Sequence, residues 1–326
     1  MILLVLFSTL FVCELLYFRL ADRWRVVDKP NVRSSHSTET VRGGGIVFPL
    51  AGSLGFFLYG YGSHLFLAGL VLIAAVSFLD DVRPLPNKIR LGVHLLALLF
   101  LFAQWNLFQQ YPLLVLPALI FCAGIINAWN FMDGINGITG GYSLVVLTGL
   151  AFVNHFRSPF VDPNIITVFI VSLLVFNFFN FRTKARCFAG DVGSISMAFV
   201  VVYLLGSLIL ATGDLAAICF VAVYGVDSVL TIIHRLLLKE NIFQAHRKHL
   251  YQLLANERKV PHLWVSLLYM GIQAGIIVGY FFLVNQGTLV IGTYVCFVCA
   301  ALAMVYAAVK SKWHHLQKFP HKYEIS

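Results

Sequence analysis

Long apolar stretches recur along almost the whole chain, and short polar segments separate them. Eleven of these stretches are predicted to be helices that cross a bilayer, because a transmembrane helix needs roughly 20 mainly apolar residues. Their approximate bounds are residues 2–20, 44–61, 63–79, 90–107, 111–127, 138–154, 164–180, 194–211, 214–236, 263–284 and 287–309. The boundary at residues 60–63 is the weakest, so ten spans is the alternative count. Lipid offers backbone groups no hydrogen-bond partner, so we predict an all-α, polytopic helical bundle in one transmembrane domain over residues 1–326.

Composition agrees with a membrane protein and excludes a soluble domain. Hydrophobic residues make up 60% of the 326 residues and charged residues only 11%, and the mean hydropathy is +0.85. The net charge of +9 does not indicate nucleic-acid binding, because the basic residues lie between the apolar stretches. The six cysteines lie mostly within those stretches, so no disulfide framework is expected. The chain opens on an apolar stretch without a basic leader, and we expect a retained first span rather than a signal peptide.

The basic residues fall on alternate connections between the predicted spans. With eleven spans the termini lie on opposite sides, and we place the N-terminus outside and the C-terminus in the cytoplasm. The cytoplasmic segments are then residues 19–43, 80–90, 128–137, 181–193, 235–262 and 310–326. They contain 22 of the 23 Lys and Arg residues, and Arg157 is the exception. The positive-inside rule therefore supports this topology.

A polar row interrupts the apolar pattern in residues 127–141. Asn127, Asn130, Asp133 and Asn136 recur at three-residue spacing, which predicts that they share roughly one face of a helix. Unpaired polar groups near lipid cost several kcal/mol, so something polar is expected to meet this face. The glycines in the same segment leave backbone N–H groups open to an anion such as phosphate.

Two further acidic sites lie at predicted span ends on the same side. Asp80 and Asp81 end the third span, where they repel each other and meet the negative end of the helix dipole. A bound cation, or the nearby Arg83 and Lys88, would relieve both effects, and a solvated loop pair is the alternative. Asp191 opens the eighth span, where it would suit a divalent cation that bridges to a phosphate, and a helix N-cap is the alternative.

Basic and glycine-rich segments complete the candidate chemistry. Arg42 precedes three glycines at the start of the second span, which forms a possible anion cradle. His246 and His249 flank Arg247 and would share a face if their loop were helical, forming a phosphate-binding or acid–base site. Zinc ligation and a basic loop on anionic lipid are the alternatives. Asp227, within the ninth span, either lines the same site or makes a structural hydrogen bond.

Together and in this order, these motifs resemble the polyprenyl-phosphate N-acetylhexosamine-1-phosphate transferase family, also called glycosyltransferase family 4. The family includes the enzymes that start O-antigen, enterobacterial common antigen and teichoic acid linkage synthesis, and the phospho-MurNAc-pentapeptide translocase of peptidoglycan synthesis. The resemblance covers roughly residues 28–262. It rests on residues 30–36 with 42–46, 78–81, 127–141, 188–194 and 246–252.

The resemblance implies an enzyme of the bacterial inner membrane whose active site faces the cytoplasm. The phosphate of undecaprenyl phosphate attacks the β-phosphate of a UDP-N-acetylhexosamine such as UDP-GlcNAc, and UMP leaves. Mg²⁺ is the implied cofactor, with Mn²⁺ as a substitute. Phosphoryl transfer between two anions needs charge neutralisation and alignment more than covalent help, which suits the acids and bases of the motifs.

The resemblance also implies a role for each motif residue. The implied catalytic residues are Asp80, Asp81, Asp133, His246 and His249. The residues implied to bind substrate are Asn127, Asn130, Asn136, Phe188, Arg42, Lys88 and Arg247. Asp191 is the implied metal ligand, with Asp133 beside it. The second pKa of a phosphate monoester is about 6, so a strong base is not required and Asp80 is either a base or a positioning group.

The chain departs from the family pattern at several positions. Many members have a second Asp where this chain has Asn136, which leaves metal ligation at that position open. The triple-His run of the peptidoglycan translocase is absent, and the segment 246–249 is more similar to the O-antigen-initiating branch. A transporter or flippase of a lipid-linked anion is the alternative function, although its acids would be expected at mid-membrane. The choice of sugar, the lipid length and whether the protein forms a homodimer remain open.

Overall fold

The computed structural model describes residues 1–29, 39–242, 244 and 246–311. Two segments of the sequence analysis are not among these residues. The motif at residues 30–36 and the predicted cytoplasmic tail from residue 312 onward lie outside the described residues.

Helices account for nearly all of the described structure, and the predicted all-α polytopic fold is confirmed. Ten helices of the described part are long and apolar enough to cross a membrane. With α6 and α10 counted from their preceding short turns and α12 to its following one, these spans are Ile2–Trp24 (α1), His64–Val82 (α3), Asn87–Gln104 (α4), Pro112–Met132 (α6), Ile138–Phe156 (α7), Pro163–Asn180 (α8), Gly190–Thr212 (α9), Leu215–Leu237 (α10), His262–Gln286 (α12) and Thr288–Ser311 (α13). The eleventh predicted span is the shorter apolar helix Gly44–Tyr59, which combines the 3-10 turn η1 (Gly44–Ile46) with α2 (Val47–Tyr59).

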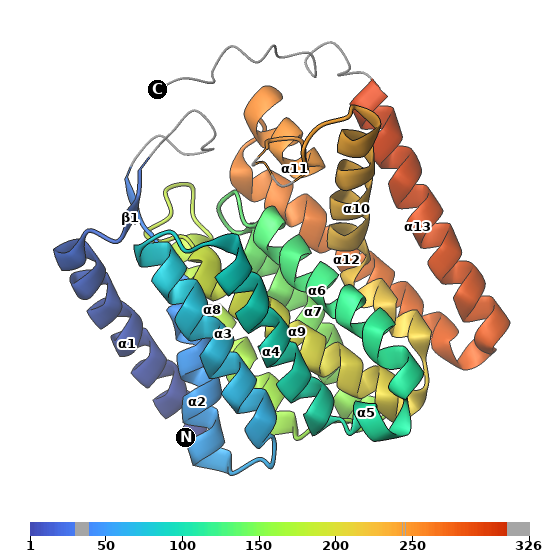
Figure 1. Ribbon diagram of the computed structural model, residues 1–326, viewed down its shortest axis with the longest axis horizontal. Coiled ribbons are helices and arrows are strands. Elements are labelled where there is room, and N and C mark those ends of the chain that lie inside the picture. Colours follow the sequence, from blue (N-terminus) through green and yellow to red (C-terminus); the bar gives the residue numbers. More distant parts are fainter. Residues whose placement is uncertain (30–38, 243, 245, 312–326) are drawn as a thin grey trace.

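The remaining helices are short and lie in connections. They are α5 (Leu107–Gln110) and α11 (Leu250–Gln252), which is followed by a π-helical turn, Leu253–Glu257. Figure 1 shows the beginning of α1 and the end of α13 at opposite ends of the bundle. This arrangement agrees with an odd number of crossings.

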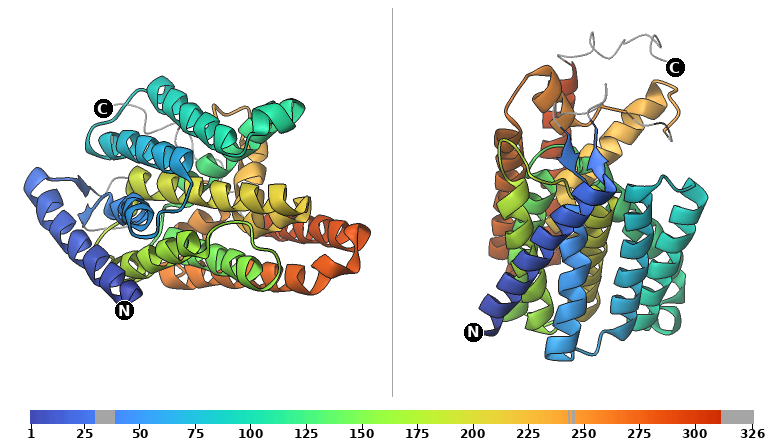
Figure 2. Two further views of the ribbon diagram at one scale, coloured as in Figure 1. Left: turned by 90° about the horizontal axis from the view of Figure 1, so that it is seen from below. Right: turned by 90° about the vertical axis from the view of Figure 1, so that its left-hand side faces the viewer.

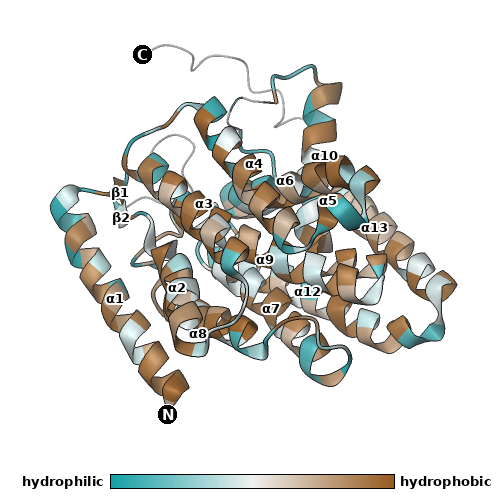
Figure 3. Ribbon diagram, turned by 60° about the horizontal axis from the view of Figure 1, so that its bottom comes forward, coloured by the Kyte–Doolittle hydropathy of each residue, from teal (hydrophilic) through white to brown (hydrophobic). Residues whose placement is uncertain are grey.

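Helix α9 forms the centre of the bundle. Most of its residues are buried, and α2, α3, α6 and α7 all contact it. Figure 2 shows this yellow helix between α3 and α4 on one side and α7 and α8 on the other. By contrast, α1 and α13 lie at opposite edges, and Figure 3 shows that hydrophobic residues cover the helices while hydrophilic residues gather at the connections. The start of α9 is therefore surrounded by protein.

Several helices continue beyond the apolar stretches that predicted them. The acidic pair Asp80 and Asp81 lies in the last turn of α3, and Asn130 lies in the last turn of α6. Backbone hydrogen bonding continues where polar side chains reach the aqueous edge, so a change in hydropathy does not mark a helix end. The connections between these helices are therefore shorter than predicted, and several of the polar residues assigned to them lie in the last turns of helices.

A small hairpin connects the first segment to the bundle. Strand β1 (Val27–Asp28) pairs antiparallel with β2 (Thr40–Val41), and Val27 lies opposite Val41. Val41 also forms a parallel bridge with Cys187, so the hairpin extends to the connection before α9. The N–H groups of Gly44 and Gly45 donate to the carbonyls of Phe188 and Ala189. Arg42 lies between Val41 and these glycines, so the contacts on both sides hold it against the start of α9.

Glycine is required where η1 crosses α9. A Cβ atom at Gly45 would lie 2.1 Å from the Cα of Gly193, closer than any real contact of this kind. Two glycines thus let the two backbones touch. This approach brings the segment before η1 within reach of the first turn of α9.

Candidate active site

Asp81, at the end of α3, caps the beginning of α9. Its Oδ1 accepts the N–H of Asp191 at 2.9 Å, and its Oδ2 accepts the N–H of Val192 at 2.9 Å. The first N–H groups of a helix have no partner within the helix, and the dipole there is positive. The carboxylate that was unfavourable at the end of its own helix is therefore stabilised by the start of another.

Two arginines join the acidic residues. The Nε of Arg42 donates to Asp81 Oδ1 at 2.6 Å, and its Nη2 lies 3.4 Å from Asp191 Oδ1. The guanidinium of Arg90 bridges Asp80 Oδ2 and Asp191 Oδ2, at 2.9 Å each. The side chains come from α3, α4, α9 and the segment before η1, so the tertiary fold and not the local sequence assembles this cluster.

Asp80 differs from its neighbour in its contacts. Besides Arg90, its Oδ1 accepts the backbone N–H of Leu85 at 2.6 Å, which closes the turn between α3 and α4. Arg90 was not among the residues predicted for the site. A signal was present, because Arg90 lies in the first turn of α4, where a cation is unfavourable unless an anion accompanies it.

Asn130 brings α6 to the cluster. Its Nδ2 donates to Asp191 Oδ1 at 3.1 Å and to Ser194 Oγ at 3.2 Å. Asp191 thus contacts two arginines and one amide, while its own helix is capped by Asp81. The structure therefore does not use Asp191 as a helix N-cap.

Asp133 lies next to this group, just after α6. It is half-buried, and its Oδ1 accepts a hydrogen bond of 2.6 Å from Thr139 Oγ1. Burial raises the pKa of Asp133 to about 7, and the nearby charges of Asp191 and Asp81 act in the same direction. Its carboxyl is therefore poised to gain or lose a proton near neutral pH.

The predicted row of four polar residues on one helical face is wrong, because α6 ends at Met132. Asn136 is buried beyond that end, and its Nδ2 donates to the carbonyls of Arg182 and Thr183 at 2.9 and 3.1 Å. Asn127 lies on α6 but donates to its own helix, at Ala123 O. Only Asn130 and Asp133 of the row thus reach the acidic cluster.

The two histidines come together without a helix between them. Their ring centroids are 4.9 Å apart, and both rings lie near Phe131 at the end of α6. Burial, together with neighbouring positive charges, lowers the pKa of His246 to about 3, so its ring is neutral at physiological pH. His249 is buried, with Nδ1 3.4 Å from Asp227 Oδ1.

Asp227 fastens the histidine segment to the bundle. Besides facing His249, it accepts hydrogen bonds from the hydroxyl of Tyr269 at 2.7 Å and from the N–H of Leu250 at 3.0 Å. Asp227 was predicted either to line the site or to make a structural hydrogen bond. The structure shows structural hydrogen bonds, and they hold His249 in place.

The other predicted residues occupy different positions. Phe188 is half-buried in the connection before α9, with its N–H bound to Val41 O. Lys88 is exposed in the first turn of α4, and Arg247 is half-buried between the two histidines.

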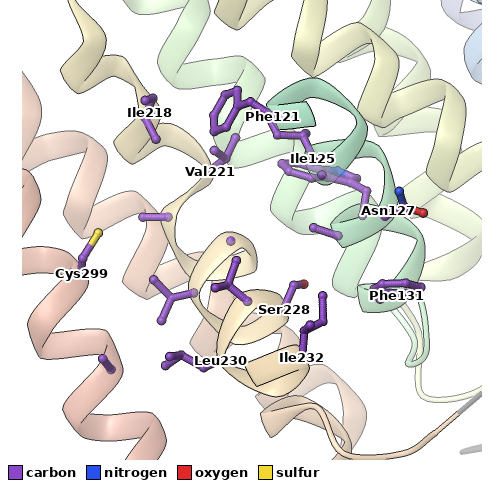
Figure 4. Close-up of a pocket in the computed structure, with 18 of the residues that line it drawn as sticks. Phe121, Ile125, Asn127, Phe131, Ile218, Val221, Ser228, Leu230, Ile232 and Cys299 are labelled. Carbon is purple, nitrogen blue, oxygen red and sulfur yellow. The ribbon is translucent and has the colours of Figure 1, made fainter. Parts of the chain in front are cut away.

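An apolar groove of about 830 Å³ runs beside the site, between α6, α10 and α13. Figure 4 shows Phe121 and Ile125 of α6 across from Val221 and Leu230, with Asn127 near one end. Nearly all of its lining is apolar, and its polar members include Asn127, Ser228 and His246. Because α6 ends near the histidines, the groove leads from the depth of the bundle to the end that holds the acidic cluster.

No preformed metal cage is present in the part of the chain that the structure describes. Within it, no three His, Cys, Asp or Glu side chains lie close enough together to hold an ion by themselves. The oxygen atoms available near the cluster belong to carboxylates and amides, which are ligands for a hard cation such as Mg²⁺.

Comparison with known proteins gives consistent results. The sequence profile described as glycosyl transferase family 4 matches residues 63–209, which include the acidic pair, Asn130, Asp133 and Asp191. The chain is 27% identical over 257 residues to a "Probable undecaprenyl-phosphate N-acetylglucosaminyl 1-phosphate transferase" of Bacillus subtilis, covering 72% of this chain and 70% of the relative.

Two further relatives represent two branches. The undecaprenyl-phosphate alpha-N-acetylglucosaminyl 1-phosphate transferase of Escherichia coli K12 is 26% identical over 275 residues, covering 76% of this chain and 74% of the relative. The phospho-N-acetylmuramoyl-pentapeptide-transferase of Fervidobacterium nodosum is 28% identical over 182 residues, covering 50% and 57%. The acidic cluster at the start of α9, the profile match across it and these relatives agree: residues 63–209 of the chain match glycosyl transferase family 4, and the chain is similar over about three quarters of its length to undecaprenyl-phosphate N-acetylglucosaminyl 1-phosphate transferases.

Proposed function

We propose that this protein transfers a sugar-1-phosphate, with N-acetylglucosamine as the first candidate, from a UDP-sugar to undecaprenyl phosphate and releases UMP. The observation that carries the proposal is that the acid–arginine cluster and an apolar groove meet at the end of α6, where Asn130 contacts the cluster and the next residue, Phe131, lines the groove. A reaction between a nucleotide anion and an isoprenoid lipid needs these two environments side by side. The names of the relatives supply the acceptor, undecaprenyl phosphate, and the transferred group, N-acetylglucosamine 1-phosphate.

The groove supplies the environment for the acceptor. Its lining between α6, α10 and α13 is apolar and faces the depth of the bundle, as a polyprenyl chain requires. Its end near Phe131 and His246 lies next to Asn130, which contacts Asp191. A phosphate attached to a chain in the groove would therefore be delivered toward the acidic cluster.

The arginines supply the charge that the donor requires. Arg42 and Arg90 are both bound to carboxylates, and their planar guanidinium groups also match phosphate oxygens. Without substrate, the acids keep these arginines oriented. With a UDP-sugar bound, we expect the diphosphate to take up donors of the two arginines while Asp81 continues to cap α9.

The transfer itself needs alignment more than a strong base. An oxygen of the lipid phosphate attacks the β-phosphorus, and the bond from that phosphorus to the oxygen of the α-phosphate breaks. The electron pair leaves with UMP. The lipid phosphate, with a second pKa of about 6, is already largely ionised at neutral pH. Arg42 and Arg90 would hold the added negative charge, and neutral His246 could donate or accept one hydrogen bond but supply no charge.

The donor set fits Mg²⁺. This ion is usually held by one or two carboxylates together with substrate phosphates, so the absence of a three-residue cage in the described part is compatible with it. Asp191 and the adjacent Asp133 are the residues that would hold it. When bound, the ion would neutralise phosphate charge during transfer.

A cytoplasmic active site in the inner membrane is part of the same proposal. The connections that the positive-inside rule assigns to the cytoplasm lie at the end of the bundle that carries the acidic cluster. UDP-sugars are cytoplasmic nucleotides, so the donor would be available there. The transporter alternative receives less support, because the described acids of the cluster lie at helix ends and not at mid-membrane.

A substrate panel tests the proposal. Purified protein in lipid nanodiscs would receive undecaprenyl phosphate, Mg²⁺ and, in turn, radiolabelled UDP-GlcNAc, UDP-GalNAc and the UDP forms of deoxy-N-acetylhexosamines. We expect butanol-extractable label with at least one sugar, dependent on both the lipid and Mg²⁺. Absence of lipid-linked product with every sugar would contradict the proposal, as would lipid translocation without UMP release.

A further inference from the structure

Lys310, in the last turn of α13, is a buried cation without a hydrogen-bond partner among the described residues. Its side chain is only 5% exposed, and its Nζ lies 4.8 Å from the centroid of the Tyr306 ring. The attraction of a cation to an aromatic ring is smaller than the cost of burying an unpaired ammonium. An anion is therefore the missing element of this position.

The acids near Lys310 are already engaged. Asp227 faces His249 and accepts from Tyr269, Leu250 and Thr231. Glu240 pairs with Lys248 and with Arg235. Lys310 thus adds a positive charge to a region whose two acids have other partners. The anion that would balance it must come from outside the described residues.

Lys310 also lies beyond the histidine end of the apolar groove. Ala303, which lines the groove, is two helical turns earlier on the same face of α13. His246 lines the groove too, and the charge of Lys310 is one of those that lower the pKa of its ring, so the two side chains are near each other. An anion attached to a chain in the groove would therefore come within reach of this ammonium.

Resting on the proposed function, we propose that Lys310 binds the phosphate headgroup of the lipid whose chain occupies the groove, as an anion-binding residue for the acceptor. The chemistry recognised is a phosphate on a hydrocarbon chain. Two lipids offer it: the polyprenyl phosphate acceptor, to which the proposal commits, and an anionic phospholipid of the bilayer.

Two substitutions and a control isolate the charge. Lys310→Met removes the ammonium but fills the same space, and Lys310→Arg keeps the charge. Lys184→Met makes the same change at an exposed lysine of another connection at this end. Replacing an unpaired buried ammonium by an apolar side chain is expected to leave folding intact or to improve it, so the melting temperature of Lys310→Met without lipid should be no lower than wild type.

Thermal stabilisation by added lipid gives a readout that needs no catalysis. Farnesyl phosphate, farnesol and phosphatidylglycerol would each be titrated into purified protein in detergent. We expect farnesyl phosphate to raise the melting temperature of wild type, Lys310→Arg and Lys184→Met, with a half-saturating concentration roughly 10-fold higher for Lys310→Met. Farnesol should not distinguish the variants.

Kinetics complete the test. For Lys310→Met we expect the KM for undecaprenyl phosphate to rise roughly 10-fold while the KM for the UDP-sugar stays within about two-fold of wild type. Equal titrations and equal KM values for Lys310→Met and wild type would overturn the inference. A Lys310-dependent effect of phosphatidylglycerol alone would overturn the assignment to the acceptor. An inactive wild type would overturn the proposed function, while the titration would still test Lys310.

Discussion

Asp191 has more polar contacts than the start of a helix requires. The capping hydrogen bonds of α9 come from Asp81, and the carboxylate of Asp191 instead faces Arg42, Arg90 and Asn130. A residue with only a structural role in the helix would not need two arginines. The two arginines pair with the negative charge of this carboxylate, and together with the amide of Asn130 they orient it at the position where we expect phosphates to bind.

Replacing Asp191 by Asn removes that charge and leaves the shape unchanged. We expect turnover to fall by roughly 100- to 1,000-fold, in the range seen when one electrostatic contact in an active site is lost. The protein should still fold, because Asp81 continues to cap α9. The measurement is initial rate together with melting temperature. Asp22→Asn, at an exposed acid paired with Arg186, is the control, and a variant at Asp191 with near-normal turnover would refute the assignment.

Asp133 allows a prediction about pH. Its pKa is raised to about 7 by burial and by neighbouring acids, so the folded state holds this proton more tightly than the unfolded state. The corresponding stability is present at low pH and is lost as the pH rises through 7. The melting temperature of metal-free wild type should therefore fall between about pH 5 and 8 by more than that of Asp133→Asn. Parallel curves for the two proteins would show that this carboxyl does not titrate there.

The sequence could identify the residue types at the site but not all of its members. Asp80, Asp81, Asn130, Asp133 and Asp191 were predicted to form one site, and the structure brings them together. Arg90 was missed, because its partners lie on helices other than its own. Lys88, two residues earlier, was chosen instead and is exposed. Side-chain direction at a helix start depends on the neighbouring helix, which a single sequence does not reveal.

At the scale of elements, the position at which α6 ends determines which polar side chains of residues 127–136 reach the acidic cluster. The three-residue spacing of Asn127 to Asn136 predicted one continuous helix, but α6 ends at Met132. Gly134 and Gly137 follow, and Gly137 has a φ of +82°, a conformation that few other residues adopt. The spacing was a valid helical pattern, and the glycines within it were the signal that it is interrupted.

The contact between η1 and α9 is the second decisive feature at this scale. Gly45→Ala would place a Cβ against the Cα of Gly193, and backbone atoms cannot move aside as a flexible side chain can. We expect a destabilisation of about 1–3 kcal/mol or more and a loss of activity, because Arg42 would shift away from Asp81. Melting temperature and initial rate are the measurements.

A matched glycine in another helix provides the control for that prediction. Gly271 lies within α12, and nothing lies within 4 Å of a Cβ added there. Gly271→Ala should leave activity unchanged and keep or raise the melting temperature, since Ala favours helix by up to about 1 kcal/mol over Gly. If Gly45→Ala were equally harmless, the close crossing of η1 and α9 would not be what positions Arg42.

At the scale of the whole molecule, hydropathy and charge predicted the fold class and the number of apolar helices. Ten spans and one shorter helix correspond to the eleven stretches. What these patterns could not supply is which helix lies in the centre, since α9 and α13 are almost equally hydrophobic but only α9 is enclosed by the others. The groove between α6, α10 and α13 was also unpredictable, because its lining consists of ordinary apolar residues.

The central claim is that a phosphate, together with its sugar, moves from nucleotide to lipid at the acidic cluster beside the groove. UDP-GlcNAc labelled with ³²P at the β-phosphate, or the best donor of the panel in the same form, tests this most directly. With wild-type protein, undecaprenyl phosphate and Mg²⁺, we predict that the ³²P enters the butanol-soluble lipid in a 1:1 ratio to UMP released, and that Asp191→Asn slows both by the same factor of roughly 100 to 1,000. Label that remains in released UDP while the sugar alone reaches the lipid would contradict the account.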